Sequence, residues 1–493
     1  MALFSLFQRI VYQNGRAGVP ESLSFERLSS LTISDLRASI GSNATRFWKF
    51  VKGVHSLVEL FHMKTLTPVA KLGEFVGSEV TLGGWVYNFR SSGSIMFLQI
   101  RDGSGFVQAI LNKQDADDAV WEAAQTITLE TSVYVTGVVA KHPKKEEYEL
   151  QVRGLEVVSI AQEYPIGKKE HGPDFLMENR HLWLRAPSQW AIQRVRNTVI
   201  NAIYEYFNSN GFTKIDSPIL TPNACEGTTT LFEVPYFEEG TAYLSQSGQL
   251  YIEAAIMSLG KVFDFGPVFR AEKSKTRRHL TEFWMMDAEM AFHDQKMNME
   301  VQEAMVMHII TRVLELNRPE LAILERDVTA LERIKTGFVR MTHAEAVKYL
   351  QAHGSDIKED EDLGNDDETL LTKEFGQPVF VTNWPAHIKA FYMKPDPTNP
   401  GTVLCADLVA PDGYGEIIGG SQREEDYETL KAKIEHEGLS LEAFQWYLDL
   451  RKYGSVPHSG FGIGLERMVA WMTGVHHIRE TIPFPRTISR IYP

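Results

Sequence analysis

The sequence has little cysteine, no long apolar run and no excess of positive charge. Its 493 residues include two cysteines, Cys225 and Cys405, and neither lies in a CxxC motif or beside a histidine cluster. A disulfide framework and a zinc ribbon are therefore excluded, and we expect a reducing compartment, the cytoplasm. No stretch approaches about 18 consecutive apolar residues, the length that spans a bilayer, so we expect no membrane partner.

The charge balance is acidic. Lys and Arg number 50 against 64 Asp and Glu, which gives a formal net charge of −14. Such a body repels nucleic acid, so non-specific coating of DNA or RNA is excluded, and a polyanion must be bound through a local basic patch. The hydrophobic share of 43% is that of a globular protein rather than of a disordered chain.

The first 62 residues differ from the rest. Residues 1–20 carry Arg9 and Arg16, no acidic residue and scattered apolar side chains, a composition typical of a transit peptide that directs import into an organelle. The alternatives are an extension without function and a start codon placed too early. We divide the chain into an extension (1–62), a small β domain (63–160), a hinge (161–185) and a larger domain (186–493).

Short alternating runs dominate the small β domain. Turn sequences such as 90–93 and 102–105 separate the runs and are typical of hairpins. The five expected strands cover residues 80–86, 95–100, 106–110, 131–139 and 148–158. Five short strands in this length favour a small closed barrel of the oligonucleotide-binding kind, the OB-fold.

The larger domain begins with an amphipathic helix over residues 188–208, whose apolar side chains recur at helical spacing. Strands and helices then alternate irregularly, without the βαβ repetition of a parallel sheet. We therefore expect an α+β protein whose second domain is an antiparallel sheet flanked by helices. The acidic run 356–368 is interpreted as a solvated insertion.

The segment from Phe269 to Phe283 carries the clearest chemistry. Arg270 ends one expected strand, a charged loop follows, and Phe283 belongs to the returning strand. This order places a guanidinium against a phosphate and an aromatic ring against a base, and a lysine would not replace the bidentate arginine. The glycine-rich segment 460–467 enters a helix where Arg467 can meet a terminal phosphate. It lacks the lysine of a Walker motif.

These two segments resemble motifs 2 and 3 of the class II aminoacyl-tRNA synthetases, and residues 211–222, with Pro218, resemble motif 1. A barrel ahead of the catalytic domain is similar to the aspartyl, asparaginyl and lysyl subgroup, and the run 270–285 looks like that of asparaginyl-tRNA synthetases. The resemblance implies ATP-dependent ligation of L-asparagine to tRNA(Asn) through an asparaginyl-adenylate. It also implies a homodimer whose interface includes residues 211–222.

Roles in the ATP site follow from the same resemblance. Arg270 would hold the α-phosphate, Phe283 would stack on adenine, and Arg467 would bind the γ-phosphate. The resemblance implies that Arg270, Glu272 and Arg467 are catalytic. It implies that the same three residues bind ATP together with His279, Phe283 and Glu416. Mg²⁺ would lie between the phosphates and the carboxylates of Asp407 and Glu416, since this cation prefers hard oxygen ligands.

The resemblance also implies which residues select the amino acid. They are Glu226, Ser247, Gln249, Asp287 and Arg423. Aspartate enzymes carry a lysine where this chain has Ile252, and without that cation a buried substrate carboxylate stays uncompensated, which favours a neutral amide. Asparagine enzymes commonly carry Glu at the position of Asp287, an acid that accepts a hydrogen bond from an amide and repels a carboxylate. Aspartate enzymes also have Asp there, so an aspartate-charging or non-discriminating enzyme stays open.

In the barrel the resemblance implies an anticodon site. Phe97 would stack on the central anticodon uridine, while Arg90 and Gln108 would form hydrogen bonds with its edge. The basic cluster 273–278 would approach the acceptor stem and ATP. The barrel disfavours a stand-alone asparagine synthetase, and the retained motif residues disfavour a non-catalytic RNA-binding relative.

Overall fold

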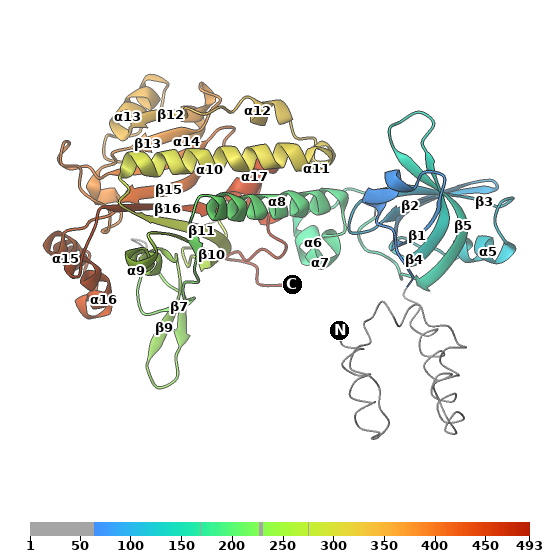
Figure 1. The fold of residues 1–493 in the computed structure, drawn as a ribbon, viewed down its shortest axis with the longest axis horizontal. Helices are drawn as coiled ribbons and strands as arrows, with labels where there is room; N and C mark the ends of the chain where they lie inside the picture. The colour runs from blue at the N-terminus through green and yellow to red at the C-terminus, as the bar shows by residue number, and fades with distance from the viewer. Residues whose placement is uncertain (1–63, 168, 226–229, 275) are drawn as a thin grey trace, which may run out of the picture. The chain divides into compact units, whose positions relative to one another are not determined.

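The structure is a computed structural model that describes residues 64–493 apart from 168, 226–229 and 275. The extension and Glu226, one of the predicted amino-acid-binding residues, lie outside the described residues. The chain divides after Gly167 into two compact units, which Figure 1 shows. Of the helices that the structure describes, none combines the length and apolar character that crossing a lipid bilayer requires.

The first unit is a closed barrel of five strands in the order β1-β2-β3-β5-β4, which confirms the predicted architecture. In chain order its elements are η1 (Val69–Phe75), β1 (Glu79–Ser92), β2 (Ile95–Arg101), β3 (Phe106–Asn112), α5 (Asp118–Gln125), β4 (Ser132–Lys141) and β5 (Tyr148–Ser159). Burial alternates along β2 from Ile95 to Ile100, so Met96, Leu98 and Ile100 enter the core while Phe97 faces outward. The pleat of β2 therefore directs Phe97 away from the core.

The second unit is built on an eight-stranded sheet in the order β12-β13-β14-β15-β16-β11-β10-β6. All pairs from β13 to β10 are antiparallel, and the two outer pairs are parallel, so the predicted antiparallel sheet is confirmed. The strands of this sheet are β6 (Thr213–Lys214), β10 (Lys261–Phe269), β11 (Glu282–Ala291), β12 (Val339–Thr342), β13 (Val379–Thr382), β14 (Cys405–Ala410), β15 (Gly415–Gln422) and β16 (His458–Gly464). A small separate sheet contains β7 (Leu220–Thr221), β8 (Glu233–Pro235) and β9 (Thr241–Leu244).

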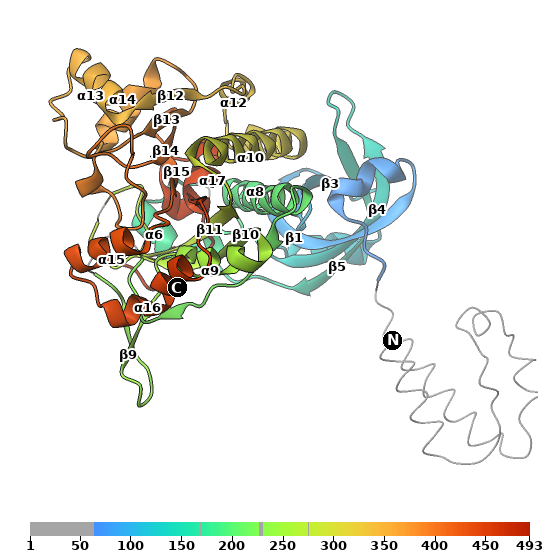
Figure 2. The same ribbon diagram turned by 60° about the vertical axis from the view of Figure 1, so that its left-hand side comes forward.

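Long helices pack on one another beside the sheet. The helix predicted over 188–208 is α8 (Pro187–Ser209), which packs against α10 (Gln295–Leu316) and α17 (Leu465–Thr473). Both views show α8 and α10 side by side (Figures 1 and 2). Apolar side chains of these helices and of β10, β11 and β16 form the main core. The remaining helices are α6 (Pro173–Glu178), α7 (Arg180–Trp183), α9 (Gln249–Leu259), α11 (Arg318–Ile323), α12 (Val328–Glu332), α13 (His343–Ala352), α14 (Asn365–Lys373), η2 (Ala386–Ile388), α15 (Tyr427–His436), α16 (Leu441–Lys452) and η3 (Ile478–Glu480).

Arg180 connects the beginning of the second unit with its end. Its side chain is fully buried in α7, and its guanidinium donates to the backbone oxygens of Glu480, Ile482 and Pro483 at 3.1, 2.9 and 2.8 Å. A buried guanidinium requires such acceptors because unpaired N–H groups would lose their hydration without compensation. Helices α6 and α7 thus belong to the folded body of this unit.

Candidate active site

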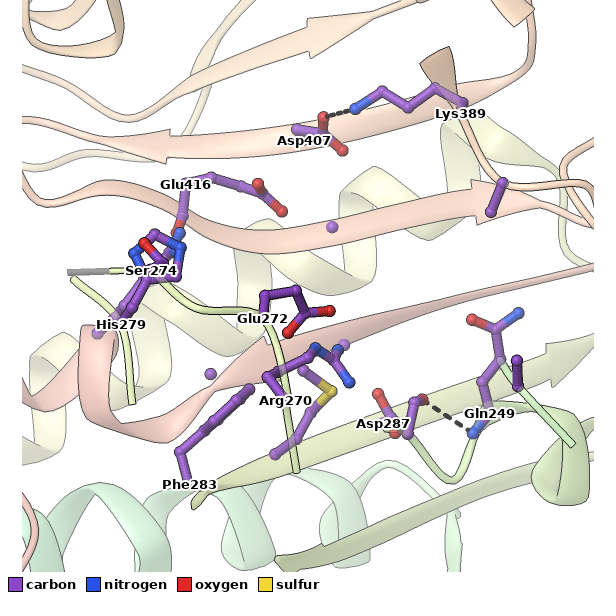
Figure 3. A pocket seen from close by; sticks show the side chains of 18 of the residues that line it. Gln249, Arg270, Glu272, Ser274, His279, Phe283, Asp287, Lys389, Asp407 and Glu416 are labelled. Carbon is purple, nitrogen blue, oxygen red and sulfur yellow. Dashed lines mark hydrogen bonds and ion pairs between the residues drawn. The ribbon is translucent and has the colours of Figure 1, made fainter. Parts of the chain in front are cut away.

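A cavity of about 930 Å³ opens over the central strands of the eight-stranded sheet (Figure 3). All the described residues predicted to bind ATP, the amino acid or the metal line it. They are Ser247, Gln249, Arg270, Glu272, His279, Phe283, Asp287, Asp407, Glu416, Arg423 and Arg467. The fold thus brings together side chains from segments up to about 220 positions apart, while their individual roles stay predictions.

Arg270 and Phe283 come together because of the register of β10 and β11. Phe269 pairs with Glu282 at the end of this antiparallel pair, so Arg270 leaves one strand where Phe283 enters the other. The Arg270 guanidinium lies 5.7 Å from the centre of the Phe283 ring and donates to the backbone oxygen of Gln246. Figure 3 places Arg270 and Glu272 in the middle of the cavity, with Asp287 and Gln249 to one side of them.

The side of the cavity beyond Arg270 is acidic. Oδ2 of Asp287 accepts hydrogen bonds from Ser247 Oγ at 2.8 Å and from the backbone N–H of Gly248 at 3.0 Å, while Oδ1 lies toward the cavity-lining Gly462. Asp264 lies opposite Asp287 in the strand register. Burial, and next the charge of Asp287, raise the pKa of Asp264 to about 7. Asp264 lines a neighbouring pocket rather than this cavity, so Asp287 is the acidic group of the pair that the cavity presents.

Ile252 is fully buried in an apolar cluster with Ile256 and Val262, and it is not among the described residues that line the cavity. This chain therefore has no cation at the position that carries a lysine in aspartate enzymes, and the preference for a neutral amide drawn from that difference stays a prediction. What the cavity presents to an amino-acid side chain is the carboxylate of Asp287 and the guanidinium of Arg423.

Arg423 is a fixed cation in the cavity wall. Its side chain is 3% exposed, and it donates to Glu289 from Nη2 at 2.9 Å and to Ser421 Oγ from Nη1 at 2.7 Å. Burial opposes the charge of Arg423, but Glu289 and Glu253 outweigh it and keep its pKa raised. Glu253 is also paired with Arg451 at 2.7 Å. This network of buried ion pairs fixes the position of the Arg423 guanidinium.

Two carboxylates at another part of the cavity suit a divalent cation. A side chain at Gly419 would lie 2.9 Å from Glu416 Oε1 and 3.7 Å from Asp407 Oδ1, so both oxygens converge on the space that this glycine leaves open. Within the described chain no three His, Cys, Asp or Glu side chains gather as a metal site. Two carboxylates fit Mg²⁺ when phosphate oxygens and water complete its shell.

Lys389 is a cavity residue that no motif in the sequence indicated. Its Nζ donates to Asp407 Oδ2 at 2.6 Å, a contact drawn in Figure 3, and it leaves Oδ1 on the side of Gly419. Burial lowers the pKa of Lys389, but Asp407 and the other negative groups beside it together outweigh burial and keep this pKa raised, so the lysine stays charged. The pair gives Asp407 a fixed direction and places a second cation near the expected phosphates.

Arg467 and His279 lie at the phosphate side of the cavity. Arg467 belongs to the first turn of α17 and donates from Nη1 to the backbone oxygen of Glu416 at 2.5 Å. His279 contacts Thr276 Oγ1 through Nδ1. Burial, and next the positive charge of Arg467, lower the pKa of His279 below its usual value, so the imidazole is neutral at physiological pH. A neutral ring can accept or donate a hydrogen bond beside a cationic neighbour.

Two interpretations of charged runs are wrong for particular residues. Arg278, assigned to a basic RNA-facing cluster, is 5% exposed and forms an ion pair with Glu368. Glu368 in turn belongs to the acidic run that was interpreted as solvated, and its side chain is 12% exposed. Arg277 donates to His476 and to the oxygen of Gly413. Within this cluster Lys273 is exposed, and Lys275 lies outside the described residues.

The predicted anticodon residues lie on the outer face of the barrel. Arg90 pairs with Phe97 across β1 and β2, and its guanidinium lies 4.4 Å from the centre of the phenyl ring. Gln108 lies on β3, and its Nε2 donates to Glu149 Oε1 at 2.7 Å. A half-buried ring beside a guanidinium is a stacking surface that suits an unpaired base. The base-binding roles themselves stay predictions.

Comparisons with known proteins agree with both units. Residues 172–488 match the family model of class II tRNA synthetases (D, K and N), and residues 80–158 match an OB-fold nucleic acid binding domain. The asparaginyl-tRNA synthetase of Pyrococcus horikoshii, solved with asparaginyl-adenylate, is 45% identical, with a TM-score of 0.84. The match covers 87% of this chain and 100% of that protein.

Two more distant structures share the whole architecture. The asparaginyl-tRNA synthetase of Entamoeba histolytica, also with asparaginyl-adenylate, is 33% identical over 85% of this chain and 97% of its own, with a TM-score of 0.78. A putative aspartyl-tRNA synthetase of Leishmania major Friedlin is 25% identical over 88% and 96%, with a TM-score of 0.76. The two substrate classes thus share one fold.

Proposed function

Because this chain belongs to the class II aminoacyl-tRNA synthetases of the aspartate, lysine and asparagine group, we propose that it attaches L-asparagine to tRNA(Asn) through an asparaginyl-adenylate. The choice of asparagine rests on one observation, the carboxylate of Asp287 in the cavity wall. Such a wall accepts hydrogen bonds from an amide NH₂ and repels the second carboxylate of aspartate. The similarity to two asparaginyl-tRNA synthetases solved with asparaginyl-adenylate supports the same choice.

Adenylate formation needs no nucleophile or general base from the protein. The carboxylate of the substrate is already ionised at neutral pH, so it attacks the α-phosphorus directly and diphosphate leaves. Arg270 stabilises the charge that builds on the α-phosphate, and Phe283 holds the adenine ring. Arg467 binds the terminal phosphate and keeps the leaving group in line. Catalysis is therefore positioning and electrostatic stabilisation, and tRNA in the second step displaces AMP.

Mg²⁺ is proposed as the cofactor that accompanies ATP. Asp407 and Glu416 would hold it, because their oxygens converge above Gly419. When bound, it would neutralise phosphate charge during adenylate formation. Lys389 keeps Asp407 in the direction that this role requires.

The tRNA is proposed to be read at the barrel, where Phe97 stacks on an anticodon base and Arg90 and Gln108 bind its edge. A homodimer is proposed through residues 211–222. Two large apolar side chains of this segment are exposed in the single chain, Ile219 at 45% and Leu220 at 41%. An interface that covers them would remove apolar surface from water.

The test is ATP–diphosphate exchange with each amino acid in turn, followed by charging of tRNA(Asn) and tRNA(Asp) transcripts. We expect exchange with asparagine and little with aspartate. The variant Asp287→Asn should lower kcat/KM for asparagine about 100-fold and narrow the discrimination against aspartate, because an amide cannot replace both properties of the carboxylate. The exposed Asp366→Asn is the matched control. Exchange with aspartate but not asparagine would establish the alternative, an aspartate-charging enzyme.

A further inference from the structure

Glu368 connects three separate segments of the second unit. It lies on α14, and its Oε2 contacts Nη1 of Arg278 in the motif-2 loop, which we define as residues 270–281. Its Oε1 accepts a hydrogen bond from the backbone N–H of Glu416 at 3.1 Å. One carboxylate thus uses both oxygens, one for the loop that carries Arg270 and one for the strand that carries Glu416.

Arg278 completes the connection from the other side. Its Nη1 also donates to Asn365 Oδ1 at 2.6 Å, and its Nη2 donates to the backbone oxygen of Gly413. Asn365 opens α14, and Gly413 belongs to the turn between β14 and β15. A planar guanidinium can serve such divergent acceptors at once, whereas a lysine ammonium has no fixed fork.

The first residue of β15 is the one that this close approach requires. Gly415 has φ of +75°, and a Cβ atom there would lie 2.5 Å from both Arg278 Nη1 and Glu368 Oε2. Any larger residue would separate the two charges or displace the turn. The sequence at this turn is therefore matched to an ion pair whose partners lie 90 positions apart.

We call the ion pair between Glu368 and Arg278, together with the hydrogen bond from Glu416 N–H to Glu368, the clamp. The clamp acts on the peptide group of Glu416. Glu368 accepts from its N–H at 3.1 Å, and Arg467 donates to its oxygen at 2.5 Å. Because the N–H and the oxygen of Glu416 are both held, its side chain is directed toward the cavity, where its Oε1 lies near Gly419. Glu368 compensates the charge of Arg278. We therefore assign the Arg278 guanidinium to the clamp and not to the binding of a phosphate.

We propose that Glu368 is a positioning residue for the nucleotide, which acts through Arg278 and the backbone of Glu416 without touching ATP. The ligand named in this inference, ATP with its cation, rests on the proposed function. The contacts of Glu368 with Arg278 and Glu416 do not depend on it. It assigns a role to one residue of an acidic run whose composition suggests a solvated loop.

The first experiment is made on the unliganded protein. Glu368→Gln keeps the shape of the side chain and removes its charge, and Asp366→Asn, an exposed acid on the same helix, is the matched control. Hydrogen exchange of the amides in residues 412–417 should become about tenfold faster in Glu368→Gln and stay unchanged in the control. Equal exchange in both variants would overturn the clamp.

The second experiment separates positioning from general stability by kinetics. In diphosphate exchange, Glu368→Gln should raise the KM for ATP about tenfold and leave the KM for asparagine within about twofold. Glu368→Asp keeps the charge and should recover most of the ATP affinity. If Glu368→Gln does not fold, Arg278→Met breaks the same ion pair and should raise the KM for ATP in the same way. Equal loss for both substrates would contradict a positioning role.

A double-mutant cycle tests whether the two residues act as one unit. Arg278→Met and Glu368→Gln together should be no worse for ATP than the poorer single variant, because either change already opens the clamp. Additive losses would contradict the proposal. If the wild-type protein failed to activate asparagine, the proposed function would fall, while hydrogen exchange in the unliganded variants would still decide the clamp.

Discussion

The outer face of the barrel and the cavity of the second unit aim their side chains in different ways. On the barrel, Phe97 points outward because β2 alternates, and Arg90 joins it through strand pairing. In the cavity, two buried charges are directed by opposite charges from distant segments, in the pairs Lys389–Asp407 and Arg423–Glu289. The comparison shows that a regular backbone suffices to present a surface, whereas a buried electrostatic site needs partners from distant segments.

The largest effect is expected where the cavity meets the reacting phosphate. Arg270→Ala should lower the rate of adenylate formation by about 100- to 1,000-fold, because the charge that builds on the α-phosphate loses its donor. The measurement is diphosphate exchange with asparagine and ATP. Lys273→Ala removes an exposed cation from the same loop and should change the rate less than twofold. A loss below tenfold in Arg270→Ala would contradict the proposed role of Arg270 in adenylate formation.

A smaller and more selective effect is expected on the barrel. Phe97→Ala should lower kcat/KM for tRNA about 10- to 100-fold, since stacking on one base contributes about 1–3 kcal/mol. Diphosphate exchange without tRNA should not change, because the barrel takes no part in adenylate formation. Trp85→Ala, which removes an exposed aromatic ring of the neighbouring strand β1, is the matched control. Equal losses in both variants would mean that the site is not at Phe97.

The smallest effect concerns the stability of the cavity wall. Asp264 has a pKa raised from 3.8 to about 7, so the folded protein loses stability as pH rises from about 4 to about 7, the range in which the unfolded chain ionises first. Asp264→Asn removes this loss and should be about 2 kcal/mol more stable than the wild type at pH 8. Urea unfolding at pH 5 and pH 8 is the measurement, and we expect the difference to shrink at pH 5. A difference independent of pH would mean that Asp264 titrates normally.

The local features of the sequence predicted the fold, while most of the cavity residues were expected from the family resemblance. The short apolar runs and turns predicted the barrel strand at 95–100, and the strand–loop–strand order around Arg270 placed it beside Phe283, whereas the base-stacking role of Phe97 came from the resemblance. These arguments work because neighbours in the sequence decide them.

The long-range pairs could not be predicted in the same way. Arg278 and Glu368 each lie among like charges that are typical of exposed segments, and only tertiary contact buries them together. Lys389 follows no recognisable pattern, and its role is visible only from its contact with Asp407. Pattern alone does not specify a partner across the fold.

The strand order also sets when each part of the protein can form during synthesis. All five barrel strands lie between Glu79 and Ser159, so this unit can fold while the ribosome is still translating the rest. The central pairing of the second unit joins Asp287 to Gly462, so the cavity cannot close until that late strand has emerged. Until then β11 has an unpaired edge that other chains could bind. The nascent protein therefore carries a finished RNA-reading unit well before it has a site for activating an amino acid.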